Sequence, residues 1–103
     1  MIYEYRVYEA TPGKLPKVVD LMEQAVPFFE KHDMKLIGCW TPDVGESNLR
    51  FIYILGFDNM AHLETAWQGF KTDPEWRSIS AEAGTDGPIT AAVYNSILEE
   101  LPI

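Results

Sequence analysis

The chain has 103 residues, 47% of them hydrophobic, which predicts a single folded domain spanning residues 1–103. Its formal net charge of −8 argues against nucleic acid and anionic membranes as partners, because both repel an acidic protein. A single cysteine excludes a disulfide framework and a cysteine-rich metal cluster. The sequence shows no signal-peptide pattern and no apolar run of membrane-spanning length, so we expect a cytoplasmic protein.

The first part of the chain predicts a strand followed by a helix. Residues 2–8 alternate with a period of two, which predicts a strand. One face of this strand carries Tyr3, Tyr5 and Val7, and the other carries Ile2, Glu4, Arg6 and Tyr8. Apolar residues at spacings of three and four then predict a helix over residues 14–31. We expect this helix to continue through Pro27 with a bend.

The middle of the chain predicts two further strands. Residues 35–41 form one, and Gly38 within it indicates a bulge or a close backbone approach. Residues 49–57 form the other, and their unbroken apolar run is typical of a strand buried on both faces. We therefore expect this strand at the centre of the sheet. Asp58 follows it as a candidate helix cap.

The last part of the chain predicts two helices and a final strand. A helix over residues 59–72 is followed by Asp73 as cap and Pro74 in the first helical position. These two residues predict a short extra helix that runs to Ala83 and ends at Gly84. Residues 89–98 alternate again and predict the last strand.

The order of these elements predicts an α+β fold of the ferredoxin-like βαββαβ type. Two right-handed crossovers around a hairpin give a four-stranded antiparallel sheet with both long helices on one face. We expect Ile2, Tyr8 and alternate residues of the central strand on the uncovered face. An apolar face of that size marks an interface, so we expect a homodimer in which two uncovered faces meet. Glu4 and Arg6 would then line a cavity between the two sheets.

Several segments together resemble the NIPSNAP family, within the dimeric α/β-barrel superfamily. They are residues 2–8, residues 12–14, the helical residues Ala66, Trp67 and Phe70, residues 73–76, and the turn at residues 86–89. The resemblance spans nearly the whole chain and implies a ferredoxin-like fold that forms a dimeric barrel. Because the family offers no settled reaction, it implies no catalytic residues.

Three residues on one strand face are the first candidates for chemistry. Glu4, Arg6 and Tyr8 place a carboxylate, a guanidinium and a phenol side by side, which could bind a carbonyl or an anion and manage a proton. We therefore name them as candidate catalytic residues. The alternative is a partly buried ion pair that only orders the interior. Trp40, Arg50 and Tyr53 are candidate substrate-binding residues, with a purely packing role as the alternative.

The remaining candidates favour structural roles. His32 and His62 fall outside the helix stripes, so we expect both to be solvated, and their spacing gives no metal site. Cys39 is expected to be a small buried hydrophobe. The sequence gives no indication of a cofactor, since it has neither a glycine-rich phosphate loop nor a nucleophile elbow.

Three functions remain open from the sequence. The first is a homodimer that binds a small, largely apolar molecule between its two sheets. The second is a cofactor-independent monooxygenase or isomerase that acts on an aromatic or polyketide-like substrate. The third is a structural protein with a filled barrel. A cavity enclosed by polar residues would favour the first two.

Overall fold

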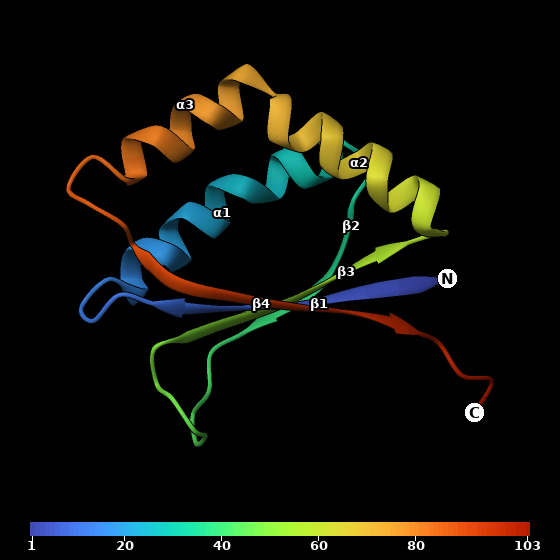
Figure 1. Cartoon of the computed structure of the whole chain (residues 1–103), viewed down its shortest axis with the longest axis horizontal. Helices are drawn as coiled ribbons and strands as arrows, with labels where there is room; N and C mark the ends of the chain where they lie inside the picture. Colours follow the sequence, from blue (N-terminus) through green and yellow to red (C-terminus); the bar gives the residue numbers. More distant parts are fainter.

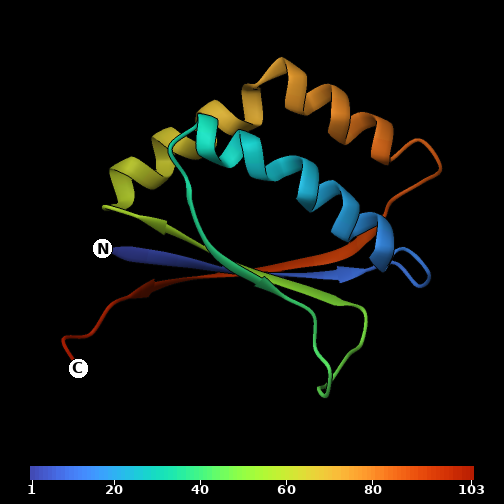
Figure 2. The same cartoon turned by 180° about the vertical axis from the view of Figure 1, so that it is seen from behind.

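The structure, a computed structural model, describes residues 1–103 as three helices over one four-stranded sheet. The elements in chain order are β1 (Ile2–Ala10), α1 (Leu15–Lys31), β2 (Lys35–Trp40), β3 (Arg50–Phe57), α2 (Met60–Thr72), α3 (Pro74–Ala83) and β4 (Thr90–Glu99). The strand order is β2-β3-β1-β4, and every neighbouring pair is antiparallel. All three helices lie on the same side of the sheet (Figures 1 and 2). This confirms the predicted ferredoxin-like fold, with β1 and β3 in the middle.

Local sequence features explain where the helices begin and continue. Pro27 lies inside α1, which continues through it as predicted. Asn59, rather than the predicted Asp58, caps α2, because the Asn59 side chain accepts a hydrogen bond from the backbone N–H of His62. Asp73 caps α3 and Pro74 occupies its first turn, as predicted. None of the helices has the length and hydropathy needed to cross a membrane.

The predicted bulge in β2 is present. The register of β2 against β3 shifts between Leu36 and Gly38. A Cβ atom at Gly38 would lie 2.9 Å from ring atoms of Trp40, so glycine allows that ring to lie over the strand. The bulge therefore sets where Trp40 lies on the sheet.

The core lies between the helices and the sheet. Phe51, Tyr53, Leu55 and Phe57 of β3 all point toward the helices and are buried. Phe29 of α1 stacks between Tyr53 and Phe70, with ring centroids 6.0 and 5.1 Å away. The other face of β3 is different, because Ile52 and Ile54 are only half-buried in a single chain. Burial of β3 on both faces is therefore not complete within one copy.

The structure corrects the predicted orientation of β1. Ile2, Glu4, Arg6 and Tyr8 pair with Phe57, Leu55, Tyr53 and Phe51 in the β1–β3 register, and directly paired residues share a face. These four residues of β1 therefore face the helices, and their predicted placement on the uncovered face is wrong. Alternation separates the two faces of a strand, but it does not say which one the helices cover.

The uncovered side of the sheet is mainly apolar, and we call it the open face. Its larger apolar residues follow from the strand registers and from the packing around Gly56: Tyr3, Tyr5, Val7, Ile37, Trp40, Ile52, Ile54, Tyr94 and Leu98. The registers place Glu9, Lys35, Arg50 and Ser96 on the same side. Several of these side chains are about half exposed in the single chain, including Trp40 at 50% and Tyr94 at 56%. The apolar open face thus exists as predicted, although other residues of β1 form it.

Candidate functional site

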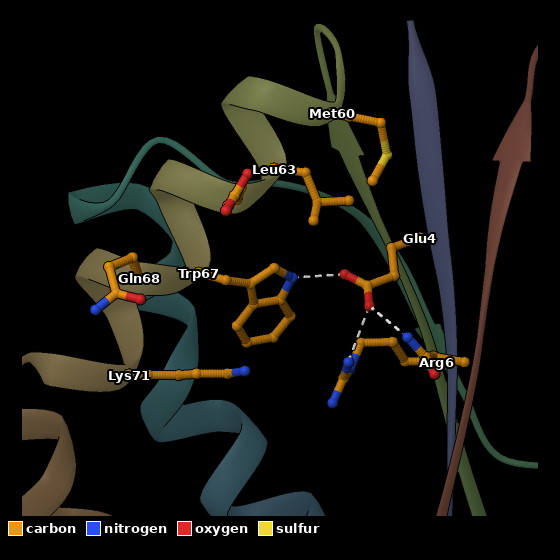
Figure 3. A pocket seen from close by; sticks show the side chains of 9 residues that line it. Glu4, Arg6, Met60, Leu63, Trp67, Gln68 and Lys71 are labelled. Carbon is orange, nitrogen blue, oxygen red and sulfur yellow. Dashed lines mark hydrogen bonds and ion pairs between the residues drawn. The ribbon is translucent and has the colours of Figure 1, made fainter.

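A cavity of about 370 Å³ lies between α2 and the sheet, next to β1 and β4. Its lining mixes polar and apolar side chains from these three elements (Figure 3): Glu4, Arg6, Met60, Leu63, Glu64, Trp67, Gln68, Lys71 and Asn95. No helix packs closely on β4, which leaves one side of the cavity open. The volume lies at the lower end of the range for small-molecule sites.

Glu4 is the most buried charged residue of the cavity, with 3% of its surface exposed. Its Oε1 atom accepts a hydrogen bond of 2.6 Å from the indole Nε1–H of Trp67 on α2. Its Oε2 atom accepts bonds from Arg6 Nη1 at 2.9 Å and from Asn95 Nδ2 at 3.1 Å. Glu4 therefore ties α2, β1 and β4 together, and its buried charge is matched by Arg6.

Arg6 extends this arrangement toward β3. Its Nε–H donates to the hydroxyl oxygen of Tyr53 over 2.7 Å, and its guanidinium carbon lies 4.7 Å from the centre of the Trp67 ring. Burial by itself would lower the pKa of Arg6. The charge interactions and hydrogen bonds with the two tyrosines and Glu4 outweigh burial and raise that pKa above its ordinary value. Arg6 is therefore a permanent cation at the cavity wall.

Two tyrosines complete the group, which we call the polar network: Glu4, Arg6, Tyr8, Tyr53, Trp67 and Asn95. The hydroxyl groups of Tyr8 and Tyr53 lie 2.9 Å apart, and their rings meet edge to face. Burial, followed by the influence of Tyr8, raises the pKa of Tyr53 well above its ordinary value, although Arg6 opposes the shift. Tyr53 therefore stays protonated and acts as a fixed hydrogen-bond partner.

The bonding pattern favours recognition over proton transfer. A carboxylate has about four lone-pair positions, and three on Glu4 are occupied, so Glu4 is poorly placed to take a proton from a ligand. The hydrogen bonds of Arg6 use Nε and Nη1, which leaves Nη2 available on a side chain that is 18% exposed. No group of three or more potential metal ligands lies together in the chain.

The structure brings together four of the six predicted site residues. Glu4, Arg6, Tyr8 and Tyr53 meet in the polar network. Trp40 and Arg50 do not join them, because both lie on the opposite side of the sheet. Trp40 pairs with Ile52 on the open face, and Arg50 pairs with Glu9 at 3.4 Å. The six candidates therefore do not form one site, because Trp40 and Arg50 lie on the open face and the other four lie on the helix side.

Sequence reasoning missed the contribution of α2 and β4. The sequence marked Trp67 through the family resemblance and not as a site residue, although its indole N–H donates a hydrogen bond to Glu4. Lys71, one turn after Trp67, and Gln68 also line the cavity. The helical spacing of Trp67 and Lys71 was visible, but nothing local indicated that a carboxylate from β1 would lie opposite.

Three predictions about single residues are also corrected. His32 is not solvated, since its Nε2 atom lies 2.7 Å from Asp73 Oδ2. His62 accepts a hydrogen bond from the Asp58 backbone N–H at Nδ1, and its Nε2 lies 2.8 Å from the carbonyl oxygen of Asp33. Cys39 is exposed, because it lies on the edge strand β2.

Asp73 joins the helices to one another. Its Oδ1 atom caps α3, and its Oδ2 atom lies 2.8 Å from Lys31 Nζ as well as close to His32 at the end of α1. The hydrogen bonds from Lys31 and His32, which favour the charged form, lower the pKa of Asp73 well below its ordinary value. The predicted capping role of Asp73 is confirmed, and its contacts with Lys31 and His32 give it a second structural role.

Comparison with known proteins places the chain in a family. The model of the NIPSNAP family matches residues 3–103. A NIPSNAP domain protein from Burkholderia xenovorans is 22% identical, with a TM-score of 0.84 over 99% of this chain and 96% of that one. Protein Atu4242 from Agrobacterium tumefaciens is 20% identical, with a TM-score of 0.86 over 99% and 95%.

A more distant structure, an antibiotic biosynthesis monooxygenase, is 10% identical, with a TM-score of 0.66 over 99% of this chain and 100% of that one. No match was found among the curated proteins. The likeness to solved structures shows the shared fold, and the family model spans nearly the whole sequence. The chain therefore belongs to the NIPSNAP family.

Proposed function

We propose that this protein binds a small organic molecule in the cavity between α2 and the sheet, and that it does so as a homodimer. The observation that carries the proposal is the polar network, in which a buried carboxylate is fixed by three hydrogen bonds at the wall of a 370 Å³ cavity. Fixed polar groups beside apolar side chains are typical of small-molecule sites. The proposed site thus lies between α2 and the sheet. The sequence had instead suggested a site between the sheets of two copies.

The polar network supports binding because it holds its groups in place before a ligand arrives. Arg6 is fixed by Glu4, Tyr53 and the Trp67 ring, so its remaining donor needs no rearrangement to meet a ligand. Leu63 and Met60 supply apolar surface on the α2 side.

The open face supports the homodimer. No helix covers it, and its apolar side chains include Ile37 at 43% exposure and Leu98 at 45%. A contiguous apolar patch of this kind marks an interaction surface. Pairing two copies of the same face through a two-fold axis is the simplest way to cover it. We therefore propose an isologous contact between two open faces.

An enzymatic role stays a separate prediction. One structural neighbour is named as an antibiotic biosynthesis monooxygenase, but at 10% identity this likeness concerns the fold alone. Catalytic roles for Glu4, Arg6 and Tyr8 would require one of them to meet a substrate atom. The occupied lone pairs of Glu4 make Arg6, as a binding group, the stronger member of this set.

The test is to identify small molecules that copurify with the native protein and to block the cavity. Gln68 and Gln24 are both exposed glutamines on helices, but only Gln68 lines the cavity. We expect mass spectrometry to find a bound molecule in the wild type and in Gln24→Trp, and to find much less in Gln68→Trp. Equal amounts in all three proteins, or none in any, would overturn binding at this cavity.

A further inference from the structure

We infer that the ligand of this cavity is an organic carboxylate, held between Arg6 and Lys71 with its apolar body against Trp67 and Leu63. The inference rests on the proposed function and adds a chemical class to it. It follows from which charged side chains of the cavity have an ion-pair partner within the chain and which do not.

The two carboxylates of the lining do not neutralise the two cations equally. Glu4 faces Arg6 and accepts hydrogen bonds from Arg6, Trp67 and Asn95. Glu64 is exposed and forms no ion pair. Glu4 therefore offsets one positive charge of the cavity wall, and the charge of Lys71 has no partner.

Four of the eight Lys and Arg side chains form no ion pair, and Lys71 is the one of these four that lines the cavity. Lys17, Lys31, Arg6 and Arg50 all have carboxylate partners within 4 Å, but Lys71 has none. The Lys71 Nζ atom lies 5.7 Å from the centre of the Trp67 ring. Its side chain runs beside that ring and points toward the guanidinium of Arg6 (Figure 3). Two positive groups therefore converge beside one aromatic ring.

This convergence favours an anion for a physical reason. An anion between Arg6 and Lys71 is attracted by both cations, and Lys71 has no carboxylate partner that would compete with it. The unused Nη2 of Arg6 and the three donors of Lys71 match the two oxygens of a carboxylate. A neutral ligand of the same shape would leave Lys71 without a counter-charge, whereas Arg6 already has Glu4.

The apolar side of the cavity defines the rest of the ligand. Trp67, Leu63 and Met60 all come from α2 and form one wall. An aromatic or other flat body can lie against this wall while its carboxylate reaches Arg6 and Lys71. A volume of about 370 Å³ suits a molecule of one or two rings.

The experiment compares an acid with its neutral isostere. We would measure the binding of 2-naphthoate and of 2-naphthamide by calorimetry and by ligand-observed NMR. The wild type should bind the acid at least about tenfold more tightly than the amide. Lys71→Gln should weaken binding of the acid about tenfold and leave binding of the amide unchanged. Lys35→Gln removes the same charge from a lysine on β2, away from the cavity, and should change neither.

The outcomes separate this inference from the proposed function. Equal affinity for acid and amide, with both blocked by Gln68→Trp, would keep the cavity as a binding site and overturn the carboxylate class. Equal weakening by Lys71→Gln and Lys35→Gln would show a general charge effect and also overturn it. Failure of both probes to bind would overturn it as well, while copurification would still decide whether the cavity holds another molecule.

Discussion

The two sides of the sheet differ in a way that runs against the usual expectation. The side covered by helices contains a buried carboxylate, a guanidinium and two linked hydroxyl groups. The uncovered side contains mainly aromatic and aliphatic residues, several of them about half exposed. Strand β1 supplies both sides, with Glu4 and Arg6 pointing inward and Tyr5 and Val7 pointing outward.

The difference indicates what each side is for. Charges under a helix layer are costly unless they are paired, and here no buried side-chain polar atom lacks a hydrogen bond. A buried and fully hydrogen-bonded group of this kind holds its side chains in fixed positions. Apolar residues on an uncovered face are instead costly in water unless another surface covers them. The covered side therefore suits ligand recognition, and the open face suits a second copy.

The largest effect should come from removing the central carboxylate of the polar network. Glu4→Ala would leave Arg6, Trp67 and Asn95 without their common acceptor, so we expect a loss of about 3–5 kcal/mol in the free energy of unfolding. Urea denaturation would measure it. Glu9→Ala is the matched control, because Glu9 lies on the same strand but forms a partly exposed pair with Arg50, where a loss within about 1 kcal/mol is expected.

Equal losses in the two glutamate variants would contradict the comparison. They would mean that the two sides of β1 contribute alike to stability and that the polar network has no special place. If Glu4→Ala does not fold, Glu4→Gln keeps the shape of the side chain and should show a smaller loss.

A smaller effect should follow from deleting one hydroxyl group. Tyr53→Phe leaves the Nε–H of Arg6 and the hydroxyl of Tyr8 without their shared partner. We expect a loss of about 1–3 kcal/mol in the free energy of unfolding. Tyr5→Phe removes a hydroxyl on the open face that makes no hydrogen bond in the chain, and thermal denaturation should show almost no change. A larger effect of Tyr5→Phe would reverse the roles that we assign to the two sides.

The fold was predictable from the sequence because its signals are local. Alternation in β1, the apolar stripe of α1, and the Asp73–Pro74 start of α3 each require only a few neighbouring residues. The order of elements then restricted the topology to the observed one. Even the bulge at Gly38 was marked by the glycine itself.

The candidate site was only half predictable because its contacts are distant in the chain. Glu4 and Trp67 are 63 residues apart, and Glu4 and Asn95 are 91 apart. Alternation placed Glu4, Arg6 and Tyr8 on one face, but only the docking of α2 shows that this face is inside. The same reason explains why Trp40 and Arg50 were grouped with the wrong residues.

The open face can be tested by adding a charge to it. Trp40→Lys would place an ammonium group in the proposed contact between two copies, so we expect the dimer dissociation constant to rise at least about tenfold, or roughly 1.4 kcal/mol. Analytical ultracentrifugation over a range of concentrations would measure it. Val26→Lys adds the same charge to an exposed position of α1, on the opposite side of the sheet (Figure 1), and should leave association unchanged. A wild-type protein that stays monomeric at high concentration would rule out the contact.

Acid should lower the free energy of unfolding, because it protonates Asp73, which connects α1 to α3. The effect should be smallest near neutral pH. The lowered pKa of Asp73 means that its charged form is favoured by the fold, through Lys31 and His32. Its contribution is therefore complete above the unfolded pKa of about 3.9 and is lost as the pH falls below that value. Asp73→Asn keeps an amide oxygen that can cap α3 but removes the charge. Urea denaturation between pH 2 and 7 should show that the free energy of unfolding declines less steeply toward acid pH in this variant, because the variant lacks the carboxylate that is protonated. Parallel curves for variant and wild type would contradict the assignment of the acid sensitivity to Asp73.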